Sequence, residues 1–342
     1  MSKIRVAING LGRIGKNICR VIVQDFQEQF EIVGANDLLP VDDIAISMQR
    51  DSVHGPFPVE VNTRAETILQ IGSHHVKVFA EPDAVNIDWA SLKVDVVFEC
   101  SRFYLTSAKA ESHIKAGAKK VIMSAPPKDE TPIFVVGVND EAITQELSIL
   151  SNASCTTNCL APVTKALDKA FGILGGLIST THAATSDQHL VDTIGGAKER
   201  SALNNIIPTS TGAARAIGKV LPHLDGKLNG TALRVPINDG SVVEAVFVID
   251  QAVTVEDIHA ALTEQAKVQN RRSMNHSVLY VGTRYQVSAD CIGAPWSSMV
   301  LTNNTQVIPL GATTLVKLTS FYDNEMGYSY RMVDLAAAAM NA

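Results

Sequence analysis

A glycine-rich turn near the start of the chain limits what its first part can fold into. Gly10, Gly12 and Gly15 form a G-x-G-x-x-G pattern, which follows the apolar run 4–9 and opens a helical stretch at 14–25. In that setting the first glycine allows a tight turn, the second lets a pyrophosphate approach the backbone, and the third lets helix and sheet pack closely. The helix N-terminus would face the phosphates. The pattern therefore predicts a dinucleotide-binding unit.

Asp37 and Arg13 refine this prediction. Asp37 stands at the end of the second predicted strand, 31–36, where its carboxylate can accept hydrogen bonds from ribose hydroxyls. Its charge would repel a 2′-phosphate, which favours NAD over NADP. Arg13 would add positive charge beside the pyrophosphate. The alternative is an ordinary glycine turn beside a solvated aspartate.

Apolar, β-branched runs alternate with helical stretches through the first 150 residues. Most of these runs are continuous, which is typical of parallel strands covered on both faces. The segment therefore predicts an α/β fold, a doubly wound Rossmann-type parallel sheet. The predicted strands are 4–9, 31–36, 76–79, 94–100, 120–124 and 134–138, and the predicted helices are 14–25 and 107–116.

From residue 151 the pattern changes to longer strand candidates with fewer helices between them. This favours an α+β domain with a large, mainly antiparallel sheet and one covering helix at 255–268. The glycine pairs 175–176 and 195–196 are interpreted as turns, and the end of the chain as a helix at 328–342. The predicted strands are 173–181, 241–250, 284–289 and 313–320.

Length and composition narrow the class of protein further. A chain of 342 residues exceeds what one core usually supports, so two domains are expected. The net charge of −6 argues against a general nucleic-acid binder. Because no apolar stretch has the length of a signal peptide or membrane span, a cytoplasmic location is expected. The cysteines lack CxxC spacing and are interpreted as reduced thiols without a metal: Cys19, Cys100, Cys155, Cys159 and Cys291.

Cys155 is the candidate nucleophile. It lies among the small polar residues of segment 151–158, and the segment suits a turn into a helix, whose N-terminus lowers a thiol pKa and offers donors to an oxyanion. His182 follows the predicted strand 173–181 and is the candidate base. Spacing alone does not establish that the two side chains meet, so two separate buried polar residues remain the alternative. Cys159, in the same helix, is expected to pack inward.

Hydroxyl groups, backbone N–H groups and one cation form a second set of candidates. Thr156, Thr157 and the segment 208–212 can bind phosphate with little net charge, and Thr185 and Asp187 extend the polar strand end after His182. Arg234 stands alone in an apolar, strand-like segment, where a charge usually has an anionic partner. A structural salt bridge and a substrate phosphate explain it equally well.

A cysteine nucleophile combined with a nicotinamide cofactor points to aldehyde oxidation through a thioester. Seven segments resemble phosphorylating glyceraldehyde-3-phosphate dehydrogenases, which are glycolytic enzymes, and their close relative erythrose-4-phosphate dehydrogenase. The resemblance runs from the first residues to the C-terminal helix. The segments are 9–15, 51–55, 151–160, 180–183, 210–214, 234–236 and 322–325.

The resemblance implies a fold, an assembly and a set of site residues. It implies a homotetramer, an NAD-binding domain of residues 1–151 and 320–342, and a catalytic domain of residues 152–319 whose sheet carries subunit contacts. Cys155 would attack the aldehyde while His182 takes the proton. Inorganic phosphate would be held by Ser154, Thr156, Thr211 and Gly212, and the substrate phosphate by Thr185, Asp187 and Arg234. The NAD contacts would be Asn9, Gly10, Gly12, Arg13, Ile14, Gly15, Asp37, Ser124 and Asn324.

Several positions depart from the family pattern. Ser101 and Arg102 replace a usual Thr-Gly, and Ala184 and Met326 replace common aromatic residues. The loop 193–200 is about two residues shorter than expected from the family resemblance and lacks the usual arginine pair, so Lys198 or Arg200 would have to contact the substrate phosphate. Lysine cannot reproduce a bidentate arginine contact.

Three alternatives remain beside the main prediction. Erythrose-4-phosphate dehydrogenase releases an acid with water, whereas the intact segment 209–212 and Arg234 favour use of phosphate. A regulatory paralogue that keeps only NAD binding is suggested by Ser101, Arg102 and the short loop. A cysteine hydrolase without cofactor would leave the glycine pattern and Asp37 unexplained.

Overall fold

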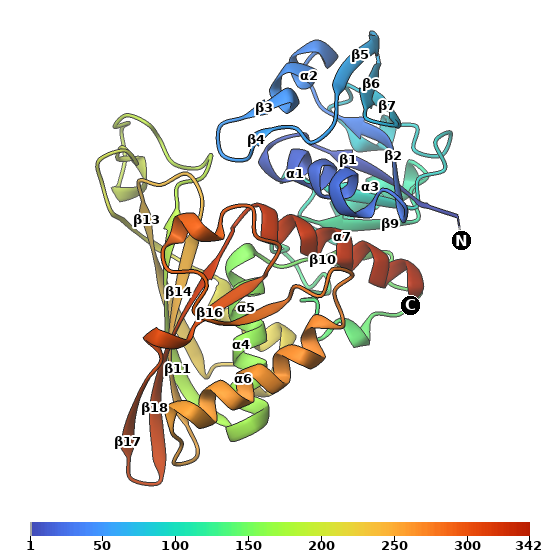
Figure 1. The fold of residues 1–342 in the computed structure, drawn as a ribbon. Helices are drawn as coiled ribbons and strands as arrows, with labels where there is room; N and C mark the ends of the chain where they lie inside the picture. Colours follow the sequence, from blue (N-terminus) through green and yellow to red (C-terminus); the bar gives the residue numbers. More distant parts are fainter. Residues whose placement is uncertain (1) are drawn as a thin grey trace. The chain divides into compact units, whose positions relative to one another are not determined.

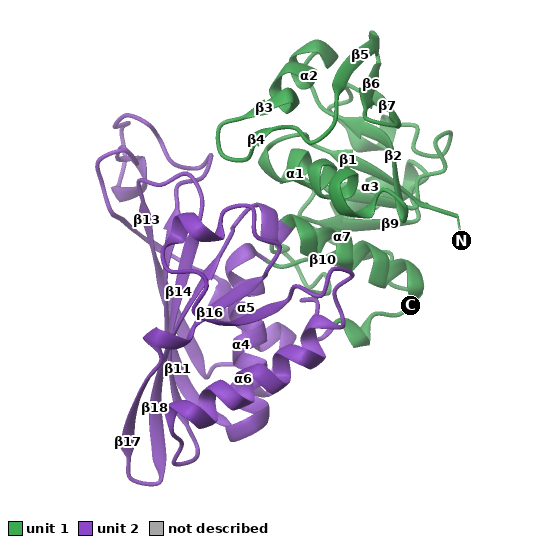
Figure 2. Ribbon diagram, viewed as in Figure 1, with its two compact units in different colours: residues 1–134, 140–153, 329–342 green, residues 135–139, 154–328 purple. Residues whose placement is uncertain are grey.

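The chain forms two compact units in the computed structural model, which describes residues 2–342 (Figure 1 and Figure 2). Unit 1 takes in the chain up to Phe134, then Asp140–Ala153 and Ser329–Ala342. Unit 2 consists of Val135–Asn139 and Ser154–Tyr328. The first predicted domain boundary, at 151, lies close to a crossing between units. The second, at 320, falls inside strand β18, Thr313–Tyr322, and the functional division itself stays a prediction.

Unit 1 is built on one eight-stranded sheet in the order β10-β9-β8-β1-β2-β7-β6-β5. The six strands from β10 to β7 pair in parallel, and β6 and β5 continue the sheet as an antiparallel hairpin. The predicted parallel α/β sheet is therefore confirmed. The strands are β1 Ile4–Asn9, β2 Phe30–Asn36, β5 Val61–Ala65, β6 Ile68–Ile71, β7 His74–Phe79, β8 Val96–Glu99, β9 Lys120–Met123 and β10 Ile149–Ser151.

The middle of this sheet explains where a ligand can bind. β1 lies between β2 and β8, so the strand order along the sheet reverses at β1. Ligands of such sheets bind beyond the carboxyl ends of the strands at this switch point. The ends of β1 and β8, at Asn9 and Glu99, therefore mark the expected position. The helices of unit 1 include α1 Arg13–Val21, α2 Val41–Gln49 and α3 Ser107–Lys115, and Arg50–Asp51 (β3) pairs with Gly55–Pro56 (β4).

Helix α7, Met326–Asn341, gives most of its length to unit 1. Met332, Val333 and Leu335 are fully buried. Tyr330 packs edge-on against Phe26 with ring centroids 6.0 Å apart and donates a hydrogen bond to Asp25. The end of the chain is thus part of the core that the first residues begin.

One predicted strand of the first 150 residues is wrong. Residues 134–138 form a turn, in which Val138 N–H donates to Val135 O and Gly137 has a φ of +82°. The apolar run exists because Val135 and Val136 are buried, not because they pair in a sheet. The parallel edge strand is β10 instead. Helix α2 and the β5–β6 hairpin have no counterpart in the prediction.

Unit 2 is built on a second sheet, in the order β12-β13-β11-β14-β18-β16-β15, with β17 on β18. Its long central pairs, β11–β14 and β14–β18, are antiparallel, which confirms the predicted mainly antiparallel sheet. The β11–β13 and β15–β16 pairs are parallel. The strands are β11 Ile173–Ala183, β12 Ile207–Ser210, β13 Leu228–Val235, β14 Ser241–Ile249, β15 Leu279–Gly282, β16 Ser298–Leu301, β17 Gln306–Leu310 and β18 Thr313–Tyr322.

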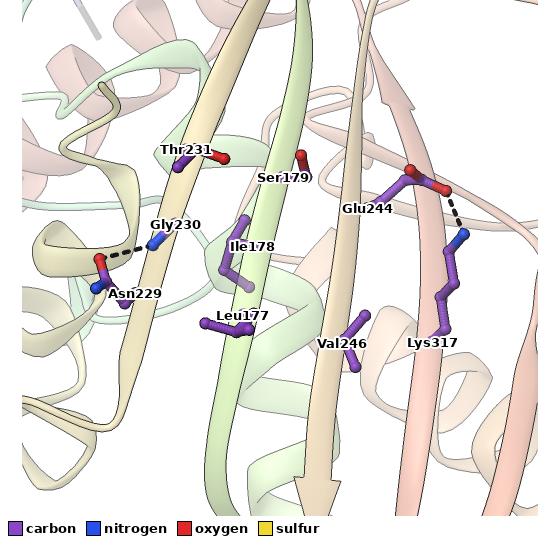
Figure 3. Close-up of a pocket in the computed structure, with 9 residues that line it drawn as sticks. All are labelled: Leu177, Ile178, Ser179, Asn229, Gly230, Thr231, Glu244, Val246 and Lys317. Atoms are coloured by element: carbon purple, nitrogen blue, oxygen red, sulfur yellow. Dashed lines mark hydrogen bonds and ion pairs between the residues drawn. The ribbon is translucent and has the colours of Figure 1, made fainter. Parts of the chain in front are cut away.

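Helices cover one face of the unit 2 sheet. These are α4 Cys155–Phe171, α5 Ala213–Val220 and α6 Val255–Asn270, and Figure 1 shows them on the same side. Alternate residues of β14 are buried under them, among them Phe247 and Ala245. On the other face Leu177, 68% exposed, lies beside Val246 in a shallow pocket (Figure 3).

Two predictions in unit 2 are wrong. Residues 284–289 are not a strand, because Asp290 accepts from the N–H groups of Gln286 and Val287 and turns the chain into a short 3₁₀ helix. Gly175 and Gly176 lie inside β11 rather than in a turn. A Cβ at Gly176 would lie 2.6 Å from Val246 O, so glycine is needed there for close strand pairing.

No helix in residues 2–342 combines the length and the apolar character that crossing a membrane requires.

Candidate active site

Cys155 is the first residue of helix α4, as the sequence predicts. Ser154 is the N-cap, and its hydroxyl accepts from Thr157 N–H at 3.1 Å. Ala153, before it, has a φ of +57°, which turns the chain sharply into the helix. The thiol therefore lies at the positive end of a 17-residue helix, where negative charge is favoured.

His182 comes from the end of β11 and meets this thiol. The distance from Cys155 Sγ to His182 Nε2 is 3.3 Å. The two residues thus form a hydrogen-bonded pair, and the alternative in which they never meet is excluded. Cys159 packs inward as expected, with its sulfur 3.7 Å from Ser298 Oγ.

Burial favours the neutral forms of both side chains. It raises the pKa of the Cys155 thiol to about 11, against the opposing effects of Arg234 and of the hydrogen bonds at Thr156. The net shift is opposite to the lowering expected from the helix N-terminus, because burial outweighs it. His182 is 5% exposed, and burial followed by repulsion from Arg234 lowers its pKa to about 4. A neutral imidazole can accept a proton from a neutral thiol during attack only if the nitrogen that faces the sulfur is unprotonated, so the tautomer of His182 decides whether it can act as a base.

Arg234 reaches the far side of the same imidazole. In the parallel β11–β13 ladder Arg234 is the register partner of His182. Its Nη1 lies 2.5 Å from His182 Nδ1 and 2.9 Å from Ala183 O. Arg234 forms no ion pair with a carboxylate in residues 2–342, and its buried Nε has no hydrogen-bond partner there. The structural salt bridge considered for Arg234 is therefore absent from the described chain.

The protonation of His182 depends on this contact. A guanidinium can only donate, so Nδ1 accepts from Arg234 and the ring proton lies on Nε2, towards the sulfur. Nδ1 also lies 2.8 Å from Ala183 O. It cannot donate to that oxygen while it accepts from Arg234. Movement of Arg234 would therefore allow the other tautomer.

Tyr322 is a site residue to which the sequence analysis gives no role. Its hydroxyl is 2.9 Å from Thr156 Oγ1 and 3.0 Å from Thr180 Oγ1, and its ring packs edge-on against His182 at 5.9 Å. It thus links α4 to β11 beneath the pair. The one indication of Tyr322 in the sequence is that it begins segment 322–325, which resembles the family pattern.

The predicted phosphate ligands fall into two groups. Ser154 and Thr156 lie beside Cys155, although the Thr156 hydroxyl is bonded to Tyr322. Thr211 accepts from Ala213 N–H and Gly212 caps helix α5, so these residues form a second helix start. In this second group the N–H groups of the first helical turn are the donors that an anion needs.

The remaining substrate candidates follow β11. Thr185 binds the Gln188 side chain through both its N–H and its hydroxyl. Lys198 lies in a short 3₁₀ helix, and Arg200 directly after it forms an exposed ion pair with Asp192 at 2.7 Å. Asp187 is also placed in this loop region. No contact brings Lys198 or Arg200 to Arg234 among residues 2–342.

Asn324 is held within unit 2. Its side-chain oxygen accepts from Ser241 Oγ at 2.5 Å, and that hydroxyl oxygen accepts from Ala183 N–H at 3.1 Å. The predicted nicotinamide contact is therefore linked to the strand end that carries His182.

In unit 1 the glycine turn has the geometry that the pattern requires. Gly10 has a φ of +94°, and a Cβ at Gly15 would lie 2.1 Å from Gly10 O. Gly12, by contrast, has no atom within 4 Å of an added Cβ, so the space beside it is open. Asp37 accepts from Leu11 N–H at 2.8 Å. These features fit a bound dinucleotide, whose pyrophosphate would approach Gly12.

The other predicted cofactor residues lie around this turn. Arg13 and Ile14 begin α1, and Arg13 forms an ion pair with Asp51. Asn9 ends β1. Ser124 follows β9, and its N–H donates to Glu99 O at 2.9 Å. The departure at Arg102 has a cost, because this residue adopts a φ of +67° that favours glycine.

A dinucleotide-binding sheet and a Cys–His pair in one chain define a cysteine-dependent dehydrogenase. The NAD-binding domain model of glyceraldehyde 3-phosphate dehydrogenase matches residues 4–107, and the C-terminal domain model of the same enzyme matches residues 154–324. The chain belongs to the glyceraldehyde-3-phosphate dehydrogenase family.

Curated relatives agree with the domain matches. The chain is 44% identical to a glyceraldehyde-3-phosphate dehydrogenase of Bacteroides fragilis over 97% of its length and 98% of that protein. It is 43% identical to the enzyme of that name from Mycobacterium avium and 42% to that from Xanthobacter flavus, each over 98% of both chains. The resemblance seen in the sequence motifs is confirmed.

Proposed function

We propose that this chain oxidises glyceraldehyde 3-phosphate with NAD and inorganic phosphate, giving 1,3-bisphosphoglycerate through a thioester on Cys155. The contact of 3.3 Å between Cys155 Sγ and His182 Nε2 carries the proposal. The NAD-binding domain match and the relatives of that name support the cofactor and the aldehyde.

The Cys155–His182 pair supplies the covalent chemistry. The sulfur attacks the aldehyde carbon, and His182 passes the thiol proton to the carbonyl oxygen. His182 then takes the proton of the new hydroxyl as hydride leaves the same carbon. NAD, when bound, is the hydride acceptor. Phosphate attacks the resulting thioester, and the thiolate of Cys155 leaves.

Arg234 couples substrate binding to the protonation of His182. Its cation and its Nε, which has no partner among residues 2–342, suit the substrate phosphate, together with the Thr185 hydroxyl, whereas the Asp187 carboxylate has no donor to offer a phosphate. When Arg234 turns to that phosphate, His182 Nδ1 is free to donate to Ala183 O, which lies 2.8 Å away. Nε2 is then unprotonated and can accept the thiol proton.

Inorganic phosphate would bind where backbone N–H groups are available. Ser154 and Thr156 at the start of α4, with Thr211 and Gly212 at the start of α5, form the proposed site. At the substrate-phosphate site, Lys198 or Arg200 would add charge only if their loop moves, because Arg200 is paired with Asp192. We therefore expect weaker affinity for the substrate phosphate than an arginine pair would give.

Initial rates of NADH formation at 340 nm test the proposal. Glyceraldehyde 3-phosphate and erythrose 4-phosphate are each supplied with and without inorganic phosphate. A phosphate-dependent signal with the first aldehyde supports it. A larger, phosphate-independent signal with the second would show the erythrose-4-phosphate enzyme. Binding of NAD without acylation of Cys155 would show a regulatory paralogue.

We also propose a homotetramer and a cytoplasmic location, both taken from the family resemblance. The uncovered face of the unit 2 sheet supports the first, because it exposes Leu177 near the Glu244–Lys317 ion pair (Figure 3). Leu174 of β11 and Ile308 and Leu310 of β17 are also exposed. Exposed apolar faces of this kind mark association surfaces. Sedimentation velocity measures the assembly directly.

A further inference from the structure

A buried polar cluster lies directly behind the glycine turn of unit 1. Glu99, at the end of β8, is fully buried and so is His113 of α3. Buried charged and polar groups of this kind are retained only when hydrogen bonds satisfy them. We call this set the Glu99 cluster; its members are Asn9, Asn36, Trp89, Glu99, Ser101 and His113.

Four donors converge on the Glu99 carboxylate. Oε1 accepts from Ser101 N–H at 2.8 Å and from the Ser101 hydroxyl at 2.5 Å. Oε2 accepts from Asn9 Nδ2 at 2.6 Å and lies 3.1 Å from His113 Nε2. Each oxygen therefore already receives two contacts, and only an acceptor suits this position.

Trp89 fixes the role of His113. The indole N–H can only donate, and it lies 3.1 Å from His113 Nδ1. Nδ1 must therefore accept, which leaves the ring proton on Nε2 and makes it a donor to Glu99. The Trp89 indole N–H can only donate and the Glu99 carboxylate can only accept, so these two groups set the direction of the hydrogen bonds at His113.

The cluster joins the segments that surround the switch point. Asn9 donates to Glu99 and its Oδ1 accepts from Asn36 Nδ2 at 2.8 Å, while Gly10 N–H donates to Asn36 O at 2.8 Å. Asn36 precedes Asp37. A Cβ at Gly10 would lie 2.9 Å from Ser101 N, so the glycine turn rests against the segment that Glu99 holds.

Ser101 also supports the strained residue beside it. Its hydroxyl oxygen accepts from Phe103 N–H at 3.2 Å while the hydroxyl proton goes to Glu99. Hydrogen bonds therefore hold the residues before and after Arg102, whose φ of +67° is unfavourable for an arginine. The Glu99 carboxylate thus contributes, through Ser101, to the shape of the wall opposite Gly10.

We propose that Glu99 is a positioning residue for NAD: it holds the glycine turn, the end of β2 and the Ser101–Arg102 wall in the arrangement that admits the dinucleotide. This inference rests on the proposed NAD-dependent function. It assigns Glu99 no contact with the cofactor. Its effect should therefore appear in NAD affinity and not in the chemistry at Cys155.

Glu99→Gln is the direct test. The amide cannot accept on both sides, so one pair of donors loses its partner. Val97→Ala is the matched control, because Val97 is fully buried on the same strand and outside the Glu99 cluster. NAD binding is measured by calorimetry, with melting temperature, kcat and the KM values of NAD and aldehyde for each protein.

We expect Glu99→Gln to weaken NAD binding and raise the KM of NAD by about tenfold, the order expected when a buried hydrogen-bonding group loses its partner. The kcat at saturating NAD and the KM of the aldehyde should stay within about twofold, and Val97→Ala should lower only the melting temperature. An unchanged NAD affinity in Glu99→Gln overturns the proposal, as does an equal loss in all kinetic constants.

Two further measurements keep the test decisive. If Glu99→Gln does not fold, Ser101→Ala removes only one hydroxyl from the Glu99 cluster and should raise the dissociation constant of NAD about threefold; no change there overturns the proposal. If the wild-type protein binds NAD but oxidises no aldehyde, the proposed function fails. The calorimetric comparison of wild type and variants then still decides the role of Glu99.

Discussion

The glycine turn of unit 1 is made of consecutive residues and backbone groups, whereas the Cys155–His182 centre of unit 2 is made of side chains from separate elements. Gly10 and Gly15 act by lacking a side chain. Cys155, His182 and Arg234 act because α4, β11 and β13 bring them within hydrogen-bond distance. A site made of consecutive residues can be predicted from a sequence pattern. A site made of residues far apart in the sequence can be predicted only when the register of the strands that carry them is known.

Removing the proposed nucleophile, Cys155, gives the largest expected effect and separates the two regions most clearly. Cys155→Ala should lower kcat by at least about four orders of magnitude, because no other group can form the thioester. NAD binding to unit 1 should persist. Turnover is measured at 340 nm and NAD affinity by calorimetry. Retained turnover would end the thioester mechanism.

Replacing the proposed base, His182, should have the next largest effect. His182→Asn keeps a polar side chain but cannot take the thiol proton, so kcat should fall by about 10²- to 10⁴-fold. The loss should be greater at neutral pH than at alkaline pH, where hydroxide assists ionisation of the thiol. A pH profile of kcat from both proteins measures this. Equal losses at every pH would mean that His182 only positions the aldehyde.

Arg234 affects the Cys155–His182 centre through its charge as well as through a hydrogen bond, so replacing it tests the electrostatics of this centre. Burial raises the pKa of the Cys155 thiol, and the Arg234 cation partly offsets this by favouring the thiolate. For His182, burial lowers the pKa and Arg234 lowers it further by repelling the imidazolium. Arg234→Gln should therefore raise both pKa values. Since iodoacetamide reacts with the thiolate, the alkylation rate of Cys155 at a fixed pH should fall about tenfold per unit of pKa rise.

The control for that experiment is Arg200→Gln, which removes an exposed cation paired with Asp192. Its alkylation profile should match the wild type. A shift of the Arg234→Gln profile to lower pH would contradict the geometry.

The glycine turn should give the smallest of these effects, and its two positions should behave differently. Gly10→Ala strains a residue at φ +94° and brings a Cβ to 2.9 Å from Ser101 N, so it should lower both stability, by about 1 to 2 kcal/mol, and NAD affinity. Gly12→Ala meets nothing within 4 Å, so only NAD affinity should fall. Thermal unfolding and calorimetry separate the two outcomes. Equal melting temperatures would show that the turn adjusts freely.

Local sequence patterns predicted the parallel strands of unit 1 and the glycine turn, because neighbouring residues determine both. The continuous apolar runs at β1, β2 and β8 indicated a parallel sheet because burial on both faces leaves no polar side, and the Gly10 turn followed from its neighbours. The apolar run at 134–138 predicts a strand but forms a turn, because burial in a turn needs the same apolar side chains as burial in a strand.

Long-range contacts were not predictable from the sequence. Arg234 meets His182 only because β13 pairs in parallel with β11 at that register, and a slip of one residue would turn Arg234 to the other face. Tyr322 and the Glu99 cluster likewise depend on which strands become neighbours. The sequence suggested the Cys155–His182 pair, but the sheet decided that the two residues meet.

The path of the chain between the units has a consequence for synthesis. Because Ser329–Ala342 belongs to unit 1, the first sheet lacks part of its core until those residues are made. Tyr330 cannot pack on Phe26 before then. On the ribosome, unit 2 would therefore have its complete sequence before unit 1 does. The domain that begins first is the one that finishes last.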